Sequence, residues 1–214
     1  MNLEYSETIN EERLYKGKRL KEILDGLNNE HKNAIIGFRV VNKKIPSVVD
    51  NEDLGWVEFK TCVDVLADMG VCFVEETDMR ELLDEFSEEI GDLYDDHRAW
   101  SVLTVLEVRD ELDFDCDFLE GNITNNRSKM NTVPIDMIGV SSHINLVTCK
   151  FNMSTQTEKT RSKAEELREL SEQIGDSCFV CLGTLSVKVK ERIENEFGSD
   201  FDRIVTGQDI LDFP

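Results

Sequence analysis

Hydrophobic residues recur along this chain with two different spacings, and the spacings separate helices from strands. A spacing near 3.6 residues predicts helices over residues 11–27, 78–93, 98–112, 157–174 and 186–197. Alternation and short apolar runs predict strands over residues 114–118, 133–140, 144–151, 178–182 and 204–205. A polar loop is expected between residues 121 and 131.

The N-terminal part of the chain has a less regular pattern. Residues 34–41 fit either a strand or a short buried helix, and residues 56–69 fit a helix that is followed by a short strand at 71–74. Residues 1–9 are polar and are expected to be frayed. These features predict a smaller α-rich domain, either winged-helix-like or purely supporting.

From residue 98 the expected order is α-β-β-β-α-β-α-β, which is an α/β domain whose mixed sheet is flanked by helices. A polar link at 91–97 separates it from the α-rich part. We therefore predict an accessory or interaction domain over 1–95 and an α/β domain over 96–214.

The charge of the chain is uneven. The net charge is −21, and residues 61–120 alone carry 20 acidic and 3 basic residues, a net charge of −17. Such acidity argues against a broad grip on nucleic-acid phosphates. It leaves two interpretations of the acidic segment, namely a solubilising face or a mimic of nucleic-acid charge that binds a basic partner.

The six cysteines are scattered through apolar segments, and only Cys178 and Cys181 form a CxxC pair. A zinc site needs about four ligands, so buried reduced thiols are expected. The sequence has no apolar run near the roughly 20 residues of a membrane span and no secretory start. These observations predict a cytoplasmic protein without a membrane partner.

Two charged residues interrupt the apolar hairpin at 133–151, namely Asp136 on its first arm and Lys150 on its second. A charge on a buried strand is costly unless it is paired or used. Side chains alternate along a strand, so Thr148 and Lys150 share a face and can converge on Asp136. The plain alternative is a cross-strand ion pair between Asp136 and Lys150.

This order of elements, with Ile135-Asp136-Met137-Ile138 and Leu146-Val147-Thr148-Cys149-Lys150 on the hairpin, resembles the PD-(D/E)xK (restriction-endonuclease-like) nuclease superfamily. The Cys-Lys ending and the downstream strand–helix–strand layout look most like the nuclease domain of CRISPR-associated CARF effectors. The resemblance covers about residues 98–214. Residues 1–95 contain no nucleotide-sensing CARF pattern.

The resemblance implies a metal-dependent nuclease that holds Mg²⁺ or Mn²⁺. Asp136 would be the central ligand, with the backbone carbonyl of Cys149 and position 148 beside it. Lys150 would orient the nucleophile or stabilise phosphate charge, and Glu107 on the preceding helix would complete the site. Arg127 and Lys129, in the loop before the hairpin, would contact backbone phosphate.

The chain departs from the family at residue 148, where Thr148 replaces an acidic residue. Either the site is weakened, or Glu158 or Glu165 from the next helix substitutes, or catalysis is lost. The leading hypothesis is therefore a metal-dependent nuclease acting on DNA or RNA, in defence against foreign nucleic acid, or its inactive relative. The rival is an acidic inhibitor or interaction protein that binds a basic protein partner. The resemblance also implies a homodimer.

Overall fold

The computed structural model describes residues 3–41, 63–68, 70, 76–112, 114–125, 132–151 and 157–211. Its helices are α1 (Glu11–Asp25), α2 (Asn29–Val41), α4 (Glu76–Asp95), α5 (His97–Leu112), α6 (Thr157–Ile174), α7 (Val187–Phe197) and α8 (Gly207–Ile210). Its strands are β1 (Leu3–Glu7), β2 (Cys116–Asn125), β3 (Val133–Val140), β4 (Ile144–Lys150), β5 (Asp176–Cys181) and β6 (Arg203–Thr206).

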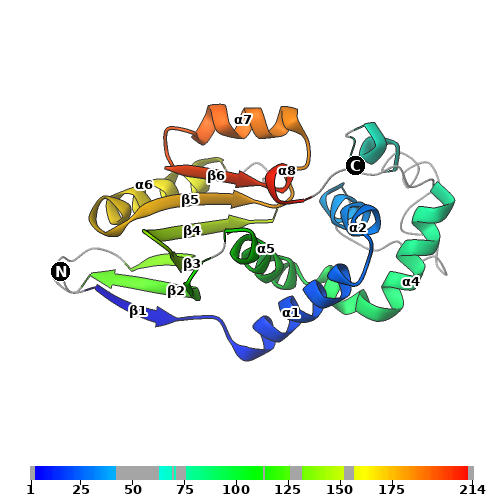
Figure 1. Cartoon of the computed structure of the whole chain (residues 1–214), viewed down its shortest axis with the longest axis horizontal. Coiled ribbons are helices and arrows are strands. Elements are labelled where there is room, and N and C mark those ends of the chain that lie inside the picture. Colours follow the sequence, from blue (N-terminus) through cyan, green and yellow to red (C-terminus); the bar gives the residue numbers. More distant parts are fainter. Residues whose placement is uncertain are drawn as a thin grey trace.

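The strands form one six-stranded sheet in which spatial order follows chain order, from β1 to β6 (Figure 1). Neighbours from β1 to β4 are antiparallel, whereas β4, β5 and β6 are parallel. Helices α6 and α7 provide the crossovers that parallel neighbours require. The fold is therefore α/β with a mixed sheet, and the order predicted from residue 98 onwards is confirmed.

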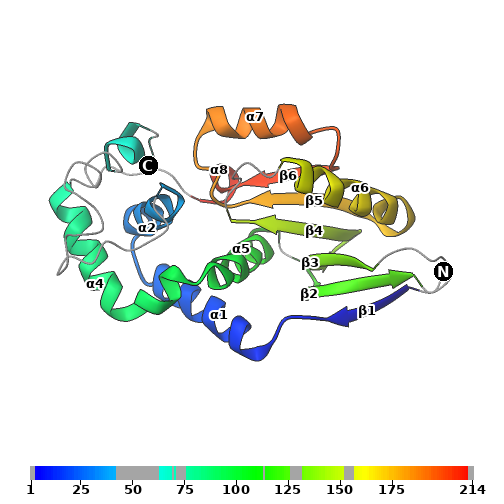
Figure 2. The ribbon, with the colours of Figure 1, turned by 180° about the vertical axis from the view of Figure 1, so that it is seen from behind.

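Helices cover both faces of the sheet. The helix α6 side is brought to the front in Figure 2, and its core combines side chains of α6 and α7 with β-strand residues such as Ile138, Leu146 and Phe179. The α5 side buries Val105 and Val108 against the alternate strand residues, including Met137 and Val147. Strands that are covered on both faces have nearly continuous apolar sequences, so a charged residue within such a strand is unusual.

The N-terminal elements are continuous with this sheet. Strand β1 pairs with β2 along its whole length, from Leu3 opposite Asn125 to Glu7 opposite Gly121. Helix α1 packs closely on α5, because a Cβ atom at Gly17 would collide with Val102. A third core joins α1, α2, α4 and the first half of α5 at one end of the molecule (Figure 1).

These contacts bear on the boundary that we predicted near residue 95. Helix α4 ends at Asp95 and α5 begins at His97, so the chain does turn at that point. The sheet nevertheless includes β1, and the α-rich core includes Leu182, Leu185 and Leu211 from the C-terminal part. Segments on both sides of the boundary therefore share one sheet and one core.

Two local expectations differ from the structure. Residues expected to be frayed form β1, and residues 121–125 extend β2 where a loop was expected. In both cases a strand distant in the sequence provides the hydrogen bonds that local patterning does not show. Residues 34–41, for which a strand or a short buried helix was predicted, belong to helix α2. The expected strand at 71–74 lies outside the described residues.

Candidate functional site around Asp136

The hairpin strands β3 and β4 separate at Asp136. Their paired register runs from Val140 opposite Ile144 to Met137 opposite Val147, while β4 continues to pair with β5 as far as Lys150. Beyond Met137, a side chain of β3 accepts a hydrogen bond from the backbone of β4, because the Cys149 N–H donates to Asp136 Oδ2 at 2.7 Å. The carboxylate thus occupies the place where the two strands part.

Three donors converge on the same oxygen of Asp136. Besides the hydrogen bond from the Cys149 N–H, Oδ2 accepts a hydrogen bond from Thr148 Oγ1 at 2.8 Å. It also forms an ion pair with Lys163 Nζ at 2.9 Å. The exposed fractions of the two charged side chains are 28% for Asp136 and 18% for Lys163, so both are mostly shielded from water. The cation beside Asp136 is therefore Lys163 of α6.

Lys163 was not among the residues that we predicted for the site, yet its position in the sequence carried a signal. It lies four residues before Leu167, on the stripe of α6 that continues to Leu170 and packs on the sheet. A lysine on the buried stripe of a helix next to a strand that bears a buried Asp predicts an ion pair. The alternative pair between Asp136 and Lys150 is not found.

Glu120 is a second carboxylate that the sequence did not point to. Register places it opposite Asp136, since Leu119 faces Met137 and Gly121 faces Ile135. Its φ of 29° is positive, an uncommon conformation for a residue other than glycine. Its backbone carbonyl accepts the N–H groups of Thr8 and Ile9, in the segment that follows β1. Its carboxylate pairs with Arg13 Nη1 at 2.8 Å.

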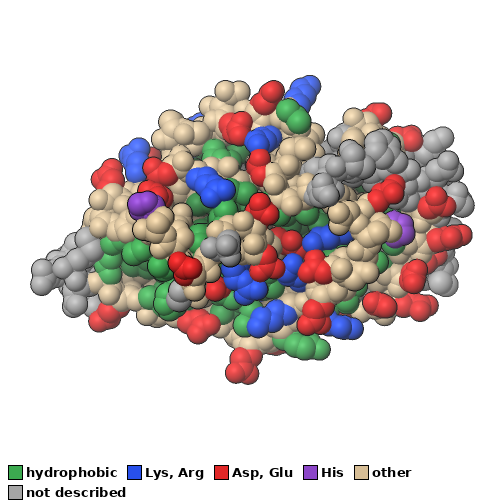
Figure 3. Space-filling model, viewed as in Figure 1, with side chains coloured by type: hydrophobic (Ala, Val, Ile, Leu, Met, Phe, Trp, Pro, Cys, Tyr) green, Lys and Arg blue, Asp and Glu red, His purple; other side chains and the backbone are tan. Residues whose placement is uncertain are grey.

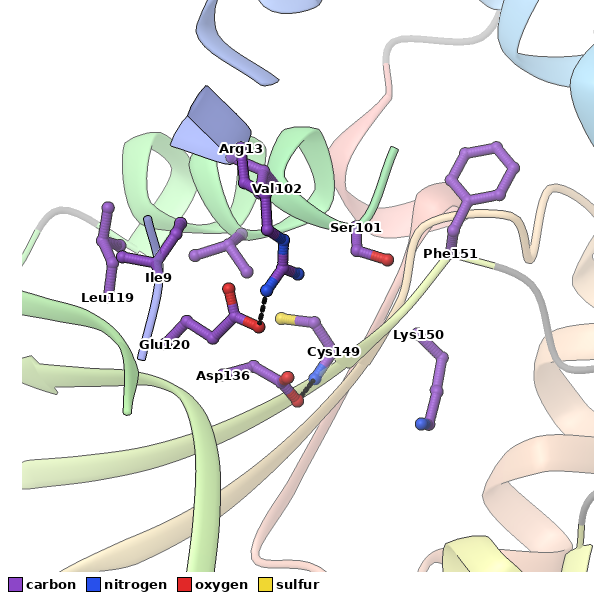
Figure 4. Close-up of a pocket in the computed structure, with 11 residues that line it drawn as sticks. Ile9, Arg13, Ser101, Val102, Leu119, Glu120, Asp136, Cys149, Lys150 and Phe151 are labelled. Carbon is purple, nitrogen blue, oxygen red and sulfur yellow. Dashed lines mark hydrogen bonds and ion pairs between the residues drawn. The ribbon is translucent and has the colours of Figure 1, made fainter. Parts of the chain in front are cut away.

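Asp136 and Glu120 open onto one pocket with a volume of about 210 Å³ between the sheet, α1 and α5 (Figure 4). We call it the Asp136 pocket, and it is lined by Ile9, Arg13, Ser101, Val102, Val105, Leu119, Glu120, Asp136, Cys149, Lys150 and Phe151. Its wall from α5 consists of one hydroxyl and two valine side chains. No carboxylate of α5 lines it among the described residues.

The expected convergence of site residues is only partly present. Thr148 does contact Asp136, but Figure 4 shows the Lys150 side chain extending away from the Asp136 carboxylate and from Glu120. Glu107 lies elsewhere, because its carboxylate pairs with Lys32 at 2.9 Å and with Lys21 at 3.4 Å. Its side chain is 8% exposed and ties α5 to α1 and α2, so the structure gives it a packing role.

The other residues named from the sequence do not add ligands. Glu158 and Glu165 of α6 are exposed, and it is Lys163 that reaches Asp136 from this helix. Arg127 and Lys129 lie outside the described residues. The structure therefore brings together Asp136 and Thr148 as expected, with the Cys149 backbone contributing its N–H group.

The cysteine thiols nearby are buried and protonated. Burial, reinforced by the charge of Asp136, raises the pKa of Cys149 well above its ordinary value. Burial also raises the pKa of Cys178 to about 12. Cys178 and Cys181 point to opposite faces of β5, toward the α5 core and the α6 core respectively. The CxxC pair thus cannot hold one metal ion, and Cys149, Cys178 and Cys181 are free thiols.

The residues of the Asp136 pocket do not suit Mg²⁺ or Mn²⁺. These ions prefer several oxygen ligands, but Asp136 Oδ2 already has three donors and Glu120 is paired with Arg13. The third position of the family pattern is the hydroxyl of Thr148, which itself donates to Asp136. Among the described residues, no three His, Cys, Asp or Glu side chains gather as a metal-binding group.

Comparisons with known proteins give no family assignment, since neither a protein-family model nor a curated protein matches this sequence. Within the described part of the chain, no helix has both the length and the apolarity that crossing a membrane requires.

Proposed function

We propose that this protein is a non-cleaving relative of the PD-(D/E)xK nucleases that works by binding a basic macromolecular partner. The observation that supports this best is the ion pair between Lys163 and Asp136, at 2.9 Å. The ammonium group lies against the carboxylate that would otherwise be the central metal ligand. Thr148 donates to the same oxygen, where the family pattern would supply a second acid.

The electrostatic reason is direct. A divalent cation at Asp136 would lie within a few ångströms of the Lys163 ammonium. Two unit charges 4 Å apart repel by about 4 kcal/mol at an effective dielectric constant near 20, and a divalent ion doubles this cost. Within the described part of the chain, the ion-pair partner of this carboxylate is Lys163, which favours a structural role for this part of the hairpin.

The charge of the molecule supports a basic partner. A net charge of −21 opposes the approach of a polyanion, whereas it accelerates encounter with a cationic surface. Figure 3 shows acidic side chains over the end of the molecule that α4 forms. The acidic residues that we considered for charge mimicry, all on α4 or just after it, are Asp78, Asp84, Glu85, Glu88, Asp92, Asp95 and Asp96.

The test is Mn²⁺ binding by calorimetry, together with cleavage assays on DNA and RNA. We expect wild type and Asp136→Asn to bind Mn²⁺ alike and to cleave neither substrate. A Thr148→Glu, Lys163→Met double variant should gain an Asp136-dependent site, with affinity about tenfold above the background of the acidic surface. Thr148→Glu, Arg168→Met is the matched control, because Arg168 is an exposed cation of the same helix.

A metal-dependent nuclease is the second candidate, with Mg²⁺ or Mn²⁺ as cofactor and DNA or RNA as substrate. It is favoured by one specific observation, that Asp136, Glu120 and Lys150 line the same pocket. Cleavage that requires metal and disappears in both Asp136→Ala and Lys150→Ala would establish this activity. The same result would overturn the non-cleaving proposal.

A further inference from the structure

A groove separates the end of α1 and the start of α2 from the middle of α4. Its volume is about 560 Å³, and it lies apart from the Asp136 pocket, with which it shares no lining residue. We call it the α1–α4 groove. Its floor is apolar, with Ile23, Leu27, Leu82 and Phe86, and its rim carries Glu85 and Glu89 on the α4 side and Arg19, Glu22 and His31 on the opposite side.

The floor is built from two apolar ridges. Ile23 lies in the last turn of α1 and Leu27 lies just after its end, and Leu82 and Phe86 are one turn apart on α4. Leu82 and Phe86 belong to the α-rich core, on which Ile23 and Leu27 pack while remaining partly exposed. Two ridges of this kind leave a furrow that matches the apolar stripe of a third helix.

The rim is negative. Glu85 and Glu89 are exposed, one turn apart on α4, and neither forms an ion pair among the described residues. Glu22 on the opposite side meets Arg19 at 3.4 Å, and both of these side chains are at least half exposed. Helix α4 as a whole carries nine acidic residues and one basic residue, Arg80, for a net charge of −8.

The acidic residues around α5 contrast with this rim. Lys16 pairs with Asp96, and Lys21 and Lys32 both pair with Glu107. Among the described residues, lysines therefore neutralise acids where α1 and α2 meet α5, whereas Glu85 and Glu89 form no ion pair. An apolar floor flanked by the acidic face of α4 is complementary to a helix with one apolar face and lysine or arginine beside it.

We propose that the α1–α4 groove binds a basic amphipathic helix of a partner protein. The apolar stripe of that helix would lie on Ile23, Leu27, Leu82 and Phe86, and its cationic flanks would face Glu85 and Glu89. This proposal rests on the proposed function, because it places the basic partner at a defined surface. It excludes nucleic acid as the occupant of the groove, since phosphates would meet the same carboxylates.

The experiment uses the full chain and a fluorescein-labelled 18-residue peptide of leucine and lysine, with leucine at helical i, i+3, i+4 and i+7 spacing. Fluorescence anisotropy near physiological ionic strength gives its Kd. We expect Glu85→Lys, Glu89→Lys to weaken binding about tenfold or more. The matched control, Glu165→Lys, Glu169→Lys, makes the same charge change one turn apart on exposed α6 and should change the Kd less than about twofold.

A second pair of measurements tests the floor. A peptide with the same composition but a scrambled order should bind at least about tenfold more weakly, because it has no apolar stripe. Leu27→Asn should also weaken the amphipathic peptide, with circular dichroism confirming that the variant is folded. Gly26 and Asn28 flank this position at the exposed end of α1, so a polar side chain can be solvated there.

Three results would overturn the proposal. If the α4 and α6 charge reversals weakened binding equally, the binding would be explained by general attraction of the peptide to a protein of net charge −21. Equal affinity for the scrambled peptide would remove the role of the floor. A dimer in sedimentation velocity that Leu27→Asn dissociates would make a second copy of this chain the occupant. Metal-dependent cleavage at Asp136 is measured separately, so failure of the non-cleaving assignment is distinguishable from failure of the groove.

Discussion

Lys163 reaches Asp136 from the helix that directly follows the hairpin, and this single contact changes the chemistry that the carboxylate can perform. The pair is mostly shielded from water, and the same oxygen accepts two further hydrogen bonds. Removing the carboxylate would leave an ammonium, a hydroxyl and an N–H group without their acceptor. The carboxylate therefore contributes to stability in this structure.

We expect Asp136→Asn to lower the free energy of unfolding by about 1–3 kcal/mol, since one partner of a shielded ion pair is lost. In a double-mutant cycle with Lys163→Met, measured by urea unfolding, the coupling should be about 1 kcal/mol or more. Arg168→Met, an exposed change on the same helix, should have little effect. An increase in stability for Asp136→Asn would instead be typical of a residue kept for activity at a cost in stability.

The buried thiols allow a second prediction at this scale. Because burial raises the pKa of both Cys149 and Cys178, their thiolate fraction at pH 8 is very small. We expect iodoacetamide to leave both residues unmodified in the native protein and to modify them in urea. Peptide mass spectrometry after a timed reaction measures this, and rapid native labelling of Cys149 would contradict the packing of the Asp136 pocket.

At the scale of elements, helices α1, α2 and α5 are joined by a cluster of charges centred on Glu107. Lys21 and Lys32 both contact Glu107 and Asp25, and Lys21 also lies 3.2 Å from Asp110. Each helix contributes at least one member. The cluster therefore fixes how the three helices approach one another, in addition to their apolar contacts.

We expect Glu107→Gln to lower the free energy of unfolding by about 2 kcal/mol, because two lysines with exposed fractions of 17% and 15% lose a charged partner. Urea unfolding measures the change. Glu111→Gln, at an exposed position one turn further along α5, is the matched control and should be nearly neutral. If Glu107→Gln altered Mn²⁺ binding without a change in stability, its assignment to packing would be wrong.

The same cluster has a pH dependence with a defined sign. Burial alone would raise the pKa of Asp25, but hydrogen bonds from Lys21 and Lys32 hold it below the ordinary value of 3.8. Its stabilisation is therefore present above pH 3.8 and is lost as the pH falls through the lower folded-state pKa. For Lys21, burial opposes the charged form, yet contacts with Asp25 and Glu107 raise its pKa above 10.5.

The contribution of Lys21 is accordingly complete below pH 10.5 and is lost as the pH rises through its higher folded-state pKa. Urea unfolding from pH 2 to 12 should show both losses. In Lys21→Met the alkaline loss should shrink, and the acid loss should shrink only in part, because Lys32 still pairs with Asp25 and the pair of Lys16 with Asp96 is unchanged. An unchanged alkaline limb would contradict this assignment.

The sequence predicts most of these elements because their signals are local. Apolar stripes identify α5 and α6, and the hairpin is visible as two apolar arms with a polar turn. Strand β1 is different, because Leu3-Glu4-Tyr5-Ser6-Glu7 has little apolar pattern and its partner is more than 100 residues away. The predicted place of Glu107 in the site differs from the structure for a related reason. Its lysine partners lie on α1 and α2, and no local pattern predicts how these helices pack on α5.

At the scale of the whole molecule, the chain is organised as one sheet with an α-rich end, and its N-terminal segment belongs to both. Strand β1 covers the edge of β2, where Tyr5 donates its hydroxyl to the Leu119 carbonyl at 2.6 Å. Helix α1 then covers α5 at Gly17. Removing the N-terminal part exposes a sheet edge and an apolar helix face together.

We therefore expect a fragment of residues 96–214 to be unable to fold as a stable monomer. Size-exclusion chromatography and urea unfolding should show aggregation or a non-cooperative transition, in contrast to the full chain. Adding a synthetic peptide of residues 1–27 in trans should partly restore soluble material. A cooperative, monomeric fragment would instead support the domain boundary that the sequence predicts near residue 95.

The pairing of β1 with β2 also means that β1 is synthesised long before the strand with which it pairs. About 110 residues separate the end of β1 from the start of β2, so at roughly 5–20 residues per second the first strand waits about 5–20 s for its partner. Its alternate residues Glu4 and Ser6 are polar, and Glu7 follows them. These side chains reduce the tendency of β1 to pair with neighbouring nascent chains. The same polar residues that make β1 difficult to predict from the sequence therefore lower the risk of aggregation during synthesis.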